Sequence, residues 1–328
     1  MNSFVRLSSR VSKISVGSTR RFSVEKLTTR DVQIIKDPSE EHVNAFQKLV
    51  GPFDDIRLLK ETMSDDYQLY LLCLKDSNEV ISGSHSVTYK SLNGSEDFQS
   101  FGLSYQPANT HHLLPLLMQQ MADELGSVKM NSGGCVESKS AAAWRKILHT
   151  KVRGATYYVS HYKPEEVFNP ELEFEDVVVK KFSEVPAEDV VAYDNSVFPY
   201  ERKQFMLAKF KKGIGRIAYD KSGKVVGIGL VSTDPSGTSD VGPMYCDHKN
   251  AAQAIFQSIL EELPLKDLDE IRVRCSDRFE ESATWIRPFL RRRHEMTPFA
   301  HIKFNRSIPD GLNLSKVFVN SNPSNAPC

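Results

Sequence analysis

The chain has 328 residues and a mass of 37.1 kDa, which suggests two domains because a domain usually takes about 100–200 residues. Its 42 basic residues balance 42 acidic residues, so the composition gives no support to a nucleic-acid-binding protein. No apolar run approaches the roughly 18 residues of a membrane-spanning helix, so we expect no membrane insertion. The five cysteines are scattered and include no C-x-x-C pair, which argues against a disulfide framework and against a zinc or other metal site.

The N-terminal segment is basic and has no acidic residue before Glu25. Its positive charges are Arg6, Arg10, Lys13, Arg20 and Arg21. Its apolar side chains recur at helical spacing, at Phe4, Leu7, Val11 and Ile14. An amphipathic, Arg- and Ser-rich, acid-free N-terminus is typical of a mitochondrial transit peptide. We therefore predict a transit peptide over residues 1–22 and a location in the mitochondrial matrix, with a disordered basic tail as the alternative.

Apolar periodicity and turn-forming residues predict alternating strands and helices through the first half of the chain. The predicted strands are Val32–Lys36, Tyr67–Leu74, Val80–Tyr89, Phe101–Tyr105, Val128–Val136 and Ala155–Tyr162. The predicted helices are Glu40–Val50, His112–Leu125 and Lys139–Leu148, and a polar stretch is expected up to Asp66.

The second half of the chain predicts the same order of elements. The predicted strands are Val177–Phe182, Gly215–Tyr219, Val225–Ser232, Val241–Cys246, Glu270–Cys275 and Phe299–Phe304. The predicted helices are Ala187–Asn195, Tyr200–Phe210, Ala251–Leu263 and Ser282–Leu290.

Two local similarities indicate that the second half repeats the first. Asp76–Ile81 resembles Lys221–Val226, which begins 145 residues later. The only two tryptophans, Trp144 and Trp285, are 141 residues apart in similar surroundings, and we expect both to be buried in the core. We therefore predict a mixed α/β (α+β) fold of two tandem domains. Each domain should have a mixed, mostly antiparallel central sheet flanked by helices.

The domain boundaries are predicted from breaks in periodicity. Lys163-Pro164 and Asn169-Pro170 interrupt both patterns. We therefore place a linker at residues 163–173, between a first domain at 30–162 and a second at 174–305. After Arg306 the chain is rich in Asn, Ser and Pro, which predicts a flexible tail over residues 306–328.

This order of elements resembles the GNAT acyltransferase superfamily. Gly215–Ser232 looks like the central hairpin of that fold, and Val241–Asp247 like the strand that leads to its cofactor helix. Gly-Pro-x-Tyr-x-Asp followed by Ala251-Ala252 is similar to the second domain of YitH/HolE-type acetyltransferases. The two-domain arrangement also resembles a family of nematode proteins that contain a domain of unknown function. The resemblance covers about residues 30–305 and implies tandem GNAT-like domains.

The resemblance also implies a chemistry. In the family two central strands splay apart, and an acyl-CoA binds between them with its pyrophosphate at a helix N-terminus. An amine then attacks the thioester, helped by a general base and a backbone donor. We therefore expect acetyl-CoA or another acyl-CoA as co-substrate and a small amine or amino acid as acceptor, with no metal and no nucleic acid. The oligomeric state is left open.

By this resemblance we place the cofactor site in the second domain, where small residues precede the helix. The expected cofactor-binding residues are Pro243, Met244, Lys249, Asn250 and Ala251. Tyr245 and Asp247 are the candidate catalytic residues; the alternative, which the frequency of aspartate as an N-cap favours, is a partly buried strand-end tyrosine and an aspartate that caps the helix. The alternative site in the first domain consists of Tyr105, Gln106, Asn109, Thr110 and His111. His85 faces either the cleft or a neighbouring strand.

Both candidate sites lack one feature of active GNAT enzymes. Their pyrophosphate loop normally contains an Arg/Gln-x-x-Gly-x-Gly/Ala motif, whereas neither Tyr105–His112 nor Asp247–Ala252 contains a glycine. The leading hypothesis is a mitochondrial acyl-CoA-dependent N-acyltransferase. The alternative is a non-catalytic GNAT-like protein that binds an acyl-CoA or a partner.

Overall fold

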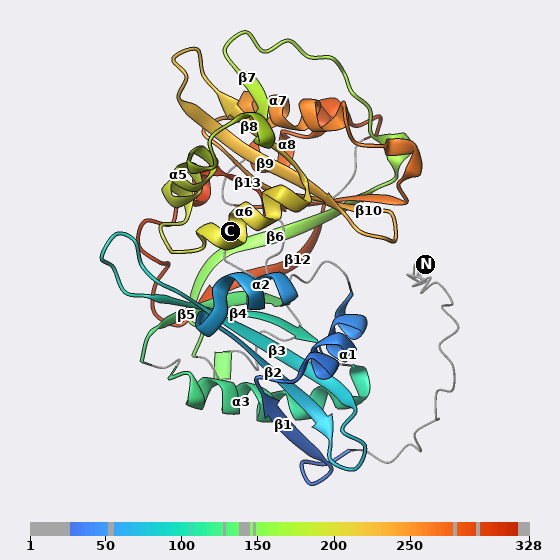
Figure 1. Cartoon of the computed structure of the whole chain (residues 1–328), viewed down its shortest axis with the longest axis vertical. Coiled ribbons are helices and arrows are strands. Elements are labelled where there is room, and N and C mark those ends of the chain that lie inside the picture. Colours follow the sequence, from blue (N-terminus) through green and yellow to red (C-terminus); the bar gives the residue numbers. More distant parts are fainter. Residues whose placement is uncertain are drawn as a thin grey trace, which may run out of the picture.

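A single 13-stranded mixed sheet runs through the whole molecule (Figure 1). The computed structural model describes residues 27–51, 56–105, 107–126, 129–137, 145–146, 149–277, 281–292 and 296–320. The predicted transit peptide, Gln106, Trp144 and most of the predicted helix Lys139–Leu148 lie outside these ranges.

In the first half, a strand and two helices precede a three-stranded meander, a helix and two further strands. The elements are β1 (Val32–Lys36), α1 (Glu40–Val50), α2 (Ile56–Met63), β2 (Tyr67–Leu74), β3 (Val80–Tyr89), β4 (Phe98–Tyr105), the 3-10 helix η2 (Ala108–Leu113), α3 (Leu114–Glu124), β5 (Asn131–Glu137) and β6 (Val152–Tyr162).

The second half repeats this order and ends with an additional strand. The elements are β7 (Val178–Lys181), α5 (Ala187–Val197), α6 (Lys203–Lys212), β8 (Ile214–Tyr219), β9 (Val225–Thr233), β10 (Thr238–Cys246), α7 (Lys249–Leu260), β11 (Glu270–Ser276), α8 (Glu281–Thr284), η7 (Arg287–Phe289), β12 (Thr297–Phe304), η8 (Leu314–Lys316) and β13 (Val317–Val319).

The strand order reads the same from both edges of the sheet. It runs β1-β2-β3-β4-β5-β12-β6-β11-β10-β9-β8-β7, with β13 beside β10. In each half, one central pair, β4–β5 or β10–β11, is parallel, and its neighbours are antiparallel. The predicted duplication is therefore visible in the topology. The halves also exchange their closing strands, because β12 of the second half pairs with β5, and β6 of the first half pairs with β11.

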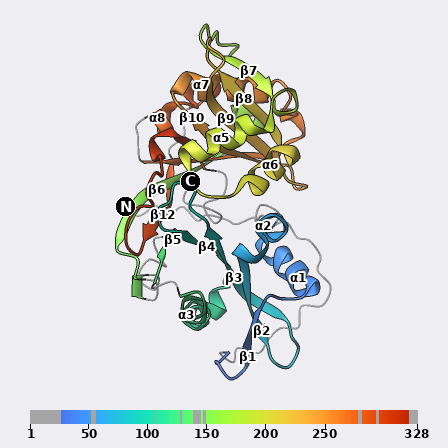
Figure 2. The same cartoon turned by 60° about the vertical axis from the view of Figure 1, so that its left-hand side comes forward.

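Helices cover both faces of this sheet (Figure 2). On one face α1 and α2 of the first half lie on the same side as α5 and α6 of the second, and α2 packs against α6. The largest hydrophobic core lies under these four helices and contains residues of both halves, such as Phe46, Phe98, Phe210 and Tyr245. On the other face α3 and α7 cover separate cores. Because one core joins the halves, the exchange of closing strands is stabilised by burial on both sides of the midline.

The mixed α/β fold is confirmed, and most predicted elements are found within a few residues. Three predictions need correction. The polar stretch before Asp66 contains the helix α2, whose Ile56, Leu58 and Leu59 are buried. The predicted helix Ser282–Leu290 is a four-residue helix followed by a 3-10 turn, because Pro288 breaks the pattern.

The third correction concerns the tail. The segment predicted as a flexible tail contains η8 and β13 within its described part, residues 306–320. Val317, Phe318 and Val319 are buried, with exposures of 1%, 1% and 0%. The Asn-, Ser- and Pro-rich composition concealed this short apolar strand, which is stabilised by tertiary packing rather than by its own propensity.

Candidate functional site

The two halves contain the same distortion in their fourth strand. In the first half Ser84 pairs with Ser104 and Ser86 with Phe101, so Gly102 and Leu103 together oppose one residue of β3, His85. Two residues opposite one is a β-bulge, which bends the strand and increases its twist.

The second half has this bulge at the equivalent place. Val231 pairs with Val241 and Gly229 with Met244, so Gly242 and Pro243 oppose Leu230. Gly242 has a φ of 121°, a conformation that favours glycine. Phe101–Tyr105 and Val241–Tyr245 are therefore equivalent segments.

At both bulges the fourth strand separates from the fifth. The parallel pairing of β4 with β5 ends at Phe101 and Gly134. The parallel pairing of β10 with β11 ends at Val241 and Val273. Beyond these points the fifth strand no longer pairs with the fourth, and the region between the two strands is here called the cleft of each half. Backbone donors and acceptors of the fourth strand that face it can pair with another extended segment or with a ligand.

The first-half cleft has a free strand edge among the described residues. Gly102–Tyr105 pairs with β3 on one side, and no described strand pairs with its other side. The Tyr105 ring packs edge-on against Phe46 of α1, with centroids 6.4 Å apart. The Ser100 hydroxyl, next to the point of separation, is buried without a hydrogen-bond partner in the described part of the chain.

His85 lies directly behind the bulge of β4. Its side chain is fully buried on the α1–α2 face of the sheet and contacts Tyr67 of β2, with ring centroids 5.4 Å apart. Tyr67 Oη lies 3.4 Å from His85 Nδ1. Of the two orientations considered for His85, the structure therefore places it against a neighbouring strand, on the face behind the cleft.

The helix start beside the first cleft offers few free amides. Residues 108–113 form the 3-10 helix η2, and the Thr110 N–H donates to the Pro107 carbonyl at 2.9 Å. Pro115 occupies the first turn of α3 and has no N–H to donate. His112 Nε2 contacts the Leu27 carbonyl at 2.6 Å. The side chains of the predicted residues Asn109 and His111, like Gln106, lie outside the described part.

The second-half cleft is filled by the chain itself. β13 pairs antiparallel with β10, and its register matches Met244 with Val319 and Tyr245 with Val317. Pro243, Met244 and Tyr245 are buried. The Tyr245 hydroxyl lies 3.4 Å from Arg202 NH2. The edge predicted to receive a cofactor is therefore already hydrogen-bonded, which argues against binding at Pro243 and Met244 and against a catalytic role for Tyr245.

Asp247 is engaged in local contacts as well. It accepts a hydrogen bond from the Tyr193 hydroxyl at 2.8 Å and forms an ion pair with Lys316 at 2.8 Å. Partial burial raises the pKa of Asp247, but the hydrogen bonds from Lys316 and Tyr193 and the charges of Lys316 and Lys224 outweigh it, so its pKa lies below the usual value. A carboxylate held ionised by these partners is a poor proton acceptor, which argues against the predicted catalytic role.

The predicted pyrophosphate helix of the second half is capped by its own residues. His248 is the N-cap of α7, and its Nδ1 accepts the Ala251 N–H at 3.2 Å. Asp247, the alternative cap considered from the sequence, does not take this role. Lys249 and Asn250 lie in the first turn, whereas Ala251 is buried. The amide that Ala251 would offer to an anion is thus already bonded.

The sequence contained a signal for the equivalence of the clefts that its analysis missed. Phe101–Tyr105 and Val241–Tyr245 both have glycine at the second and tyrosine at the fifth position, 140 residues apart. This offset nearly equals that of the two tryptophans. Trp285 is fully buried and packs edge-on against Phe256 at 5.3 Å, as predicted, while Trp144 lies outside the described residues.

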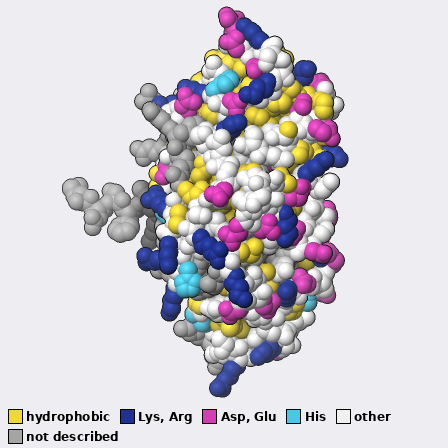
Figure 3. All heavy atoms as spheres, turned by 90° about the vertical axis from the view of Figure 1, so that its left-hand side faces the viewer, with side chains coloured by type: hydrophobic (Ala, Val, Ile, Leu, Met, Phe, Trp, Pro, Cys, Tyr) yellow, Lys and Arg dark blue, Asp and Glu magenta, His cyan; other side chains and the backbone are white. Residues whose placement is uncertain are grey.

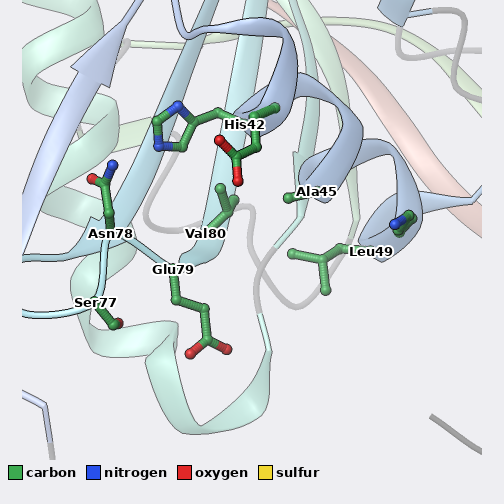
Figure 4. A pocket seen from close by; sticks show the side chains of 9 residues that line it. His42, Ala45, Leu49, Ser77, Asn78, Glu79 and Val80 are labelled. Carbon is green, nitrogen blue, oxygen red and sulfur yellow. The ribbon is translucent and has the colours of Figure 1, made fainter. Parts of the chain in front are cut away.

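A separate surface pocket of about 430 Å³ lies between α1 and the β2–β3 turn (Figure 4). Its lining includes Glu41, His42, Lys48 and Glu79 and no residue of β4 or β5. The pocket is thus distinct from the cleft. In the part of the chain that the structure describes, no group of His, Cys, Asp or Glu side chains is arranged to hold a metal ion, and no helix is long and apolar enough to cross a membrane.

Basic and acidic side chains are mixed on the face of the molecule that Figure 3 shows, in keeping with the neutral net charge of the chain. There Lys and Arg side chains alternate with Asp and Glu side chains across both halves. Mixed charge of this kind gives no extended field of one sign for a polyanion.

Comparison with known proteins identifies the class. Residues 190–282 match a model described as an acetyltransferase (GNAT) domain, so the second half contains a GNAT acetyltransferase domain. Residues 29–197, more than half of the chain, match a model described as a protein of unknown function, DUF1248, and the chain belongs to that family. No curated protein sequence matches it.

Solved structures share the fold over most of the chain. A putative acetyltransferase from Pyrococcus horikoshii is 14% identical, with a TM-score of 0.67 over 92% of this chain and 98% of that one. A GCN5-related N-acetyltransferase from Sphaerobacter thermophilus is 15% identical, with a TM-score of 0.53 over 84% and 97%. A tandem GNAT protein from the clavulanic acid biosynthesis pathway is 10% identical, with a TM-score of 0.53 over 84% and 97%. These likenesses confirm the tandem GNAT-like arrangement.

A GNAT domain implies an acyl-CoA co-substrate, and the two clefts fit this group differently. The free edge of β4 in the first cleft suits the amides of an extended pantetheine arm. The start of η2 does not form the glycine-rich backbone cradle that a pyrophosphate uses elsewhere. In the second cleft β13 covers the edge that would take the pantetheine arm, and His248 already bonds the Ala251 amide at the helix start.

Proposed function

We propose that the protein is an acyl-CoA-dependent N-acyltransferase whose acyl-CoA site is the cleft between β4 and β5. The observation that carries the proposal is the edge of Gly102–Tyr105, which no described strand pairs with beyond the bulge. This choice replaces the second-domain site expected from the sequence, whose equivalent edge is covered by β13.

In this proposal the residues of the first half have separate roles. Backbone groups of β4 hold the extended arm of the co-substrate and orient its thioester at the bulge. The amine approaches the thioester from the α1–α2 face, where His85 lies behind the bulge, and His85 receives the proton that the amine loses while the C–S bond breaks and CoA leaves as the thiol. Tyr67 positions the imidazole through the contact at Nδ1. The acceptor is a small amine or an amino acid, in keeping with the direct attack by an amine that the superfamily resemblance implies.

The test is thiol release from acetyl-CoA, propionyl-CoA and longer acyl-CoA esters in the presence of a panel of amines and amino acids. We expect amine-dependent release with at least one pair of substrates. The His85→Gln variant should retain acyl-CoA binding and lose turnover. Release that is independent of His85 would remove the histidine from the proposal, and no release with any pair would favour the second candidate.

The second candidate is a GNAT-like protein that binds an acyl-CoA or a partner without turnover. It is favoured by the start of η2 and α3, where Thr110 bonds back to Pro107 and Pro115 replaces an amide donor. Calorimetry separates the candidates: binding of acetyl-CoA without turnover supports this reading, and turnover rejects it.

The location that we propose is the mitochondrial matrix. The support is the acid-free, amphipathic segment at residues 1–22. A fluorescent fusion of residues 1–30 should colocalise with mitochondria. Replacing Arg6, Arg10 and Lys13 with Glu should leave it in the cytosol, and a uniform cytosolic signal from the unaltered fusion would reject the proposal.

A further inference from the structure

The segment Asn313–Asn320, here named the strap, bridges the two separated strands of the second half. It contains η8 and β13, and β13 pairs with β10 from Met244 onward, directly beyond the bulge. On its other side the Asn320 N–H donates to the Arg274 carbonyl of β11 at 3.0 Å. The strap thus begins to pair where β10 and β11 cease to pair with each other.

The strap is fixed by apolar packing and by polar contacts at both of its ends. Phe318 and Val319 belong to the core under α7, and Val317 belongs to the large core on the opposite face. Lys316 forms the ion pair with Asp247 and lies over the Tyr193 ring, 4.9 Å from its centroid. At the far end, Asn320 Nδ2 donates to the Tyr157 hydroxyl at 3.0 Å.

The strap occupies this cleft in the way an extended ligand would. A β-strand added to a free edge uses main-chain hydrogen bonds for affinity and alternate side chains for fit. A pantetheine arm offers amides to the same backbone groups, so β13 and an acyl-CoA exclude each other at Met244 and Tyr245. The equivalent edge of β4 pairs with no described strand. The strap is therefore what covers the strand edge in one half and not in the other.

We propose that the strap is an intrasteric ligand of the second cleft, which keeps acyl-CoA out of this half. Release of the strap would expose a second binding edge on β10. The inference rests on the tandem fold and on β13, and it holds whether or not the first cleft turns over a substrate.

The first experiment counts acetyl-CoA molecules bound per chain by native mass spectrometry and calorimetry. A chain that ends at Leu312 should bind one more equivalent than the full chain. A synthetic peptide of residues 313–320, at saturation, should weaken that additional binding at least tenfold. A folded truncated chain that gains no equivalent overturns the proposal.

Because truncation removes three buried apolar side chains and the buried Asn320, a second variant keeps the strap but loosens it. Lys316→Glu with Val317→Gly removes the ion pair and one apolar contact while Phe318 and Val319 remain. Faster amide exchange at residues 317–320 should accompany the binding of one more equivalent of acetyl-CoA than the unaltered full chain binds. Faster exchange without additional binding overturns the proposal.

The matched control locks the strap in place. Met244 and Val319 are register partners, and such partners lie about 4.5–5.5 Å apart at Cα, a separation that a disulfide spans. The oxidised Met244→Cys/Val319→Cys protein should bind as many equivalents as the unaltered full chain. If locking removes an equivalent, acyl-CoA enters by displacing the strap in the unaltered protein, and the proposal fails. If instead the cleft between β4 and β5 is not an acyl-CoA site, the result is different: the full chain binds no acetyl-CoA, whereas the loosened chain binds one equivalent.

Discussion

Lys316 Nζ lies 2.8 Å from Oδ1 of Asp247. This ion pair joins the segment before β13 to the end of β10, and the Tyr193 hydroxyl donates to the same carboxylate oxygen. The residue that the sequence suggested as a catalytic acid or base therefore holds the C-terminal strand against the sheet. A carboxylate at a strand end serves either purpose, and only the partner that the fold brings to it distinguishes them.

The first prediction concerns the pH dependence of stability at this pair. The folded pKa of Asp247 lies below 3.8, so its contribution is complete above that pH and is lost as the pH falls through the folded pKa. Lys316→Met removes a hydrogen bond and a charge, so the free energy of unfolding at pH 6 should fall by about 1 kcal/mol. The slope of stability against pH between about 4 and 2 should also become shallower.

Urea unfolding across this pH range measures both effects. The control is Lys221→Met, because Lys221 and its partner Asp176 are 68% and 80% exposed and exposed pairs contribute little. A slope in Lys316→Met equal to that of the unaltered protein would show that the pair does not hold the Asp247 pKa down.

The second prediction tests the core beneath α7. Trp285 is fully buried and packs against Phe256 at 5.3 Å. Trp285→Ala should lower the free energy of unfolding by about 3–5 kcal/mol, because it removes a large apolar surface and leaves a cavity. Val178→Ala, at a position 53% exposed, is the control and should change stability by less than about 0.5 kcal/mol. Equal denaturant midpoints for Trp285→Ala and Val178→Ala would contradict the packing of Trp285 described here.

The elements of this fold could be predicted because their signals are local. The hairpins β2–β3 and β8–β9 have alternating apolar residues around Ser77 and Ser222, and the structure contains both at nearly the predicted bounds. The repeated order of elements followed from the same patterns. The exchange of β6 and β12 did not, because no local pattern specifies which half a closing strand pairs with.

The candidate site was harder to predict, for two physical reasons. A strand edge is free or covered according to what packs beside it. The strand β13, which covers β10, begins 71 residues after Cys246, where β10 ends. Its three residues are too few to give a periodic signal in the sequence. The role of His85 depends on the bulge at Gly102, which is a register shift between two strands. Both features are tertiary, so spacing along the chain could not reveal them.

The third prediction concerns His85 and follows from the proposed function. His85→Gln should lower kcat about 10²–10⁴-fold, the usual contribution of a general base. The acidic limb of the pH profile of kcat/KM should disappear. Tyr67→Phe should shift that limb with a smaller loss of rate, because Tyr67 positions the imidazole at Nδ1. The control is His161→Gln, whose side chain is 51% exposed and pairs with Glu270. Equal losses in His85→Gln and His161→Gln would contradict the assignment.

The last prediction concerns the buried ion pair between Arg202 and Asp194. Arg202 donates from Nε and NH2 to the two carboxylate oxygens at 3.0 and 2.7 Å, and both side chains are only 2% exposed. Arg202→Met leaves the Asp194 carboxylate buried without its counter-charge, so we expect a loss of about 3–5 kcal/mol in the free energy of unfolding. The double variant Arg202→Met/Asp194→Leu removes both charges and should recover most of that loss, because the desolvation penalty disappears with the second charge.

A double-mutant cycle by urea unfolding measures the coupling energy between the two side chains. The matched control is the exposed pair Lys60–Glu40, whose side chains are 43% and 69% exposed, with an expected coupling energy below about 1 kcal/mol. A double variant as unstable as Arg202→Met would show that Arg202 stabilises the fold by packing against Phe198 rather than by its charge. The Phe198 ring centroid lies 4.3 Å from the guanidinium carbon of Arg202.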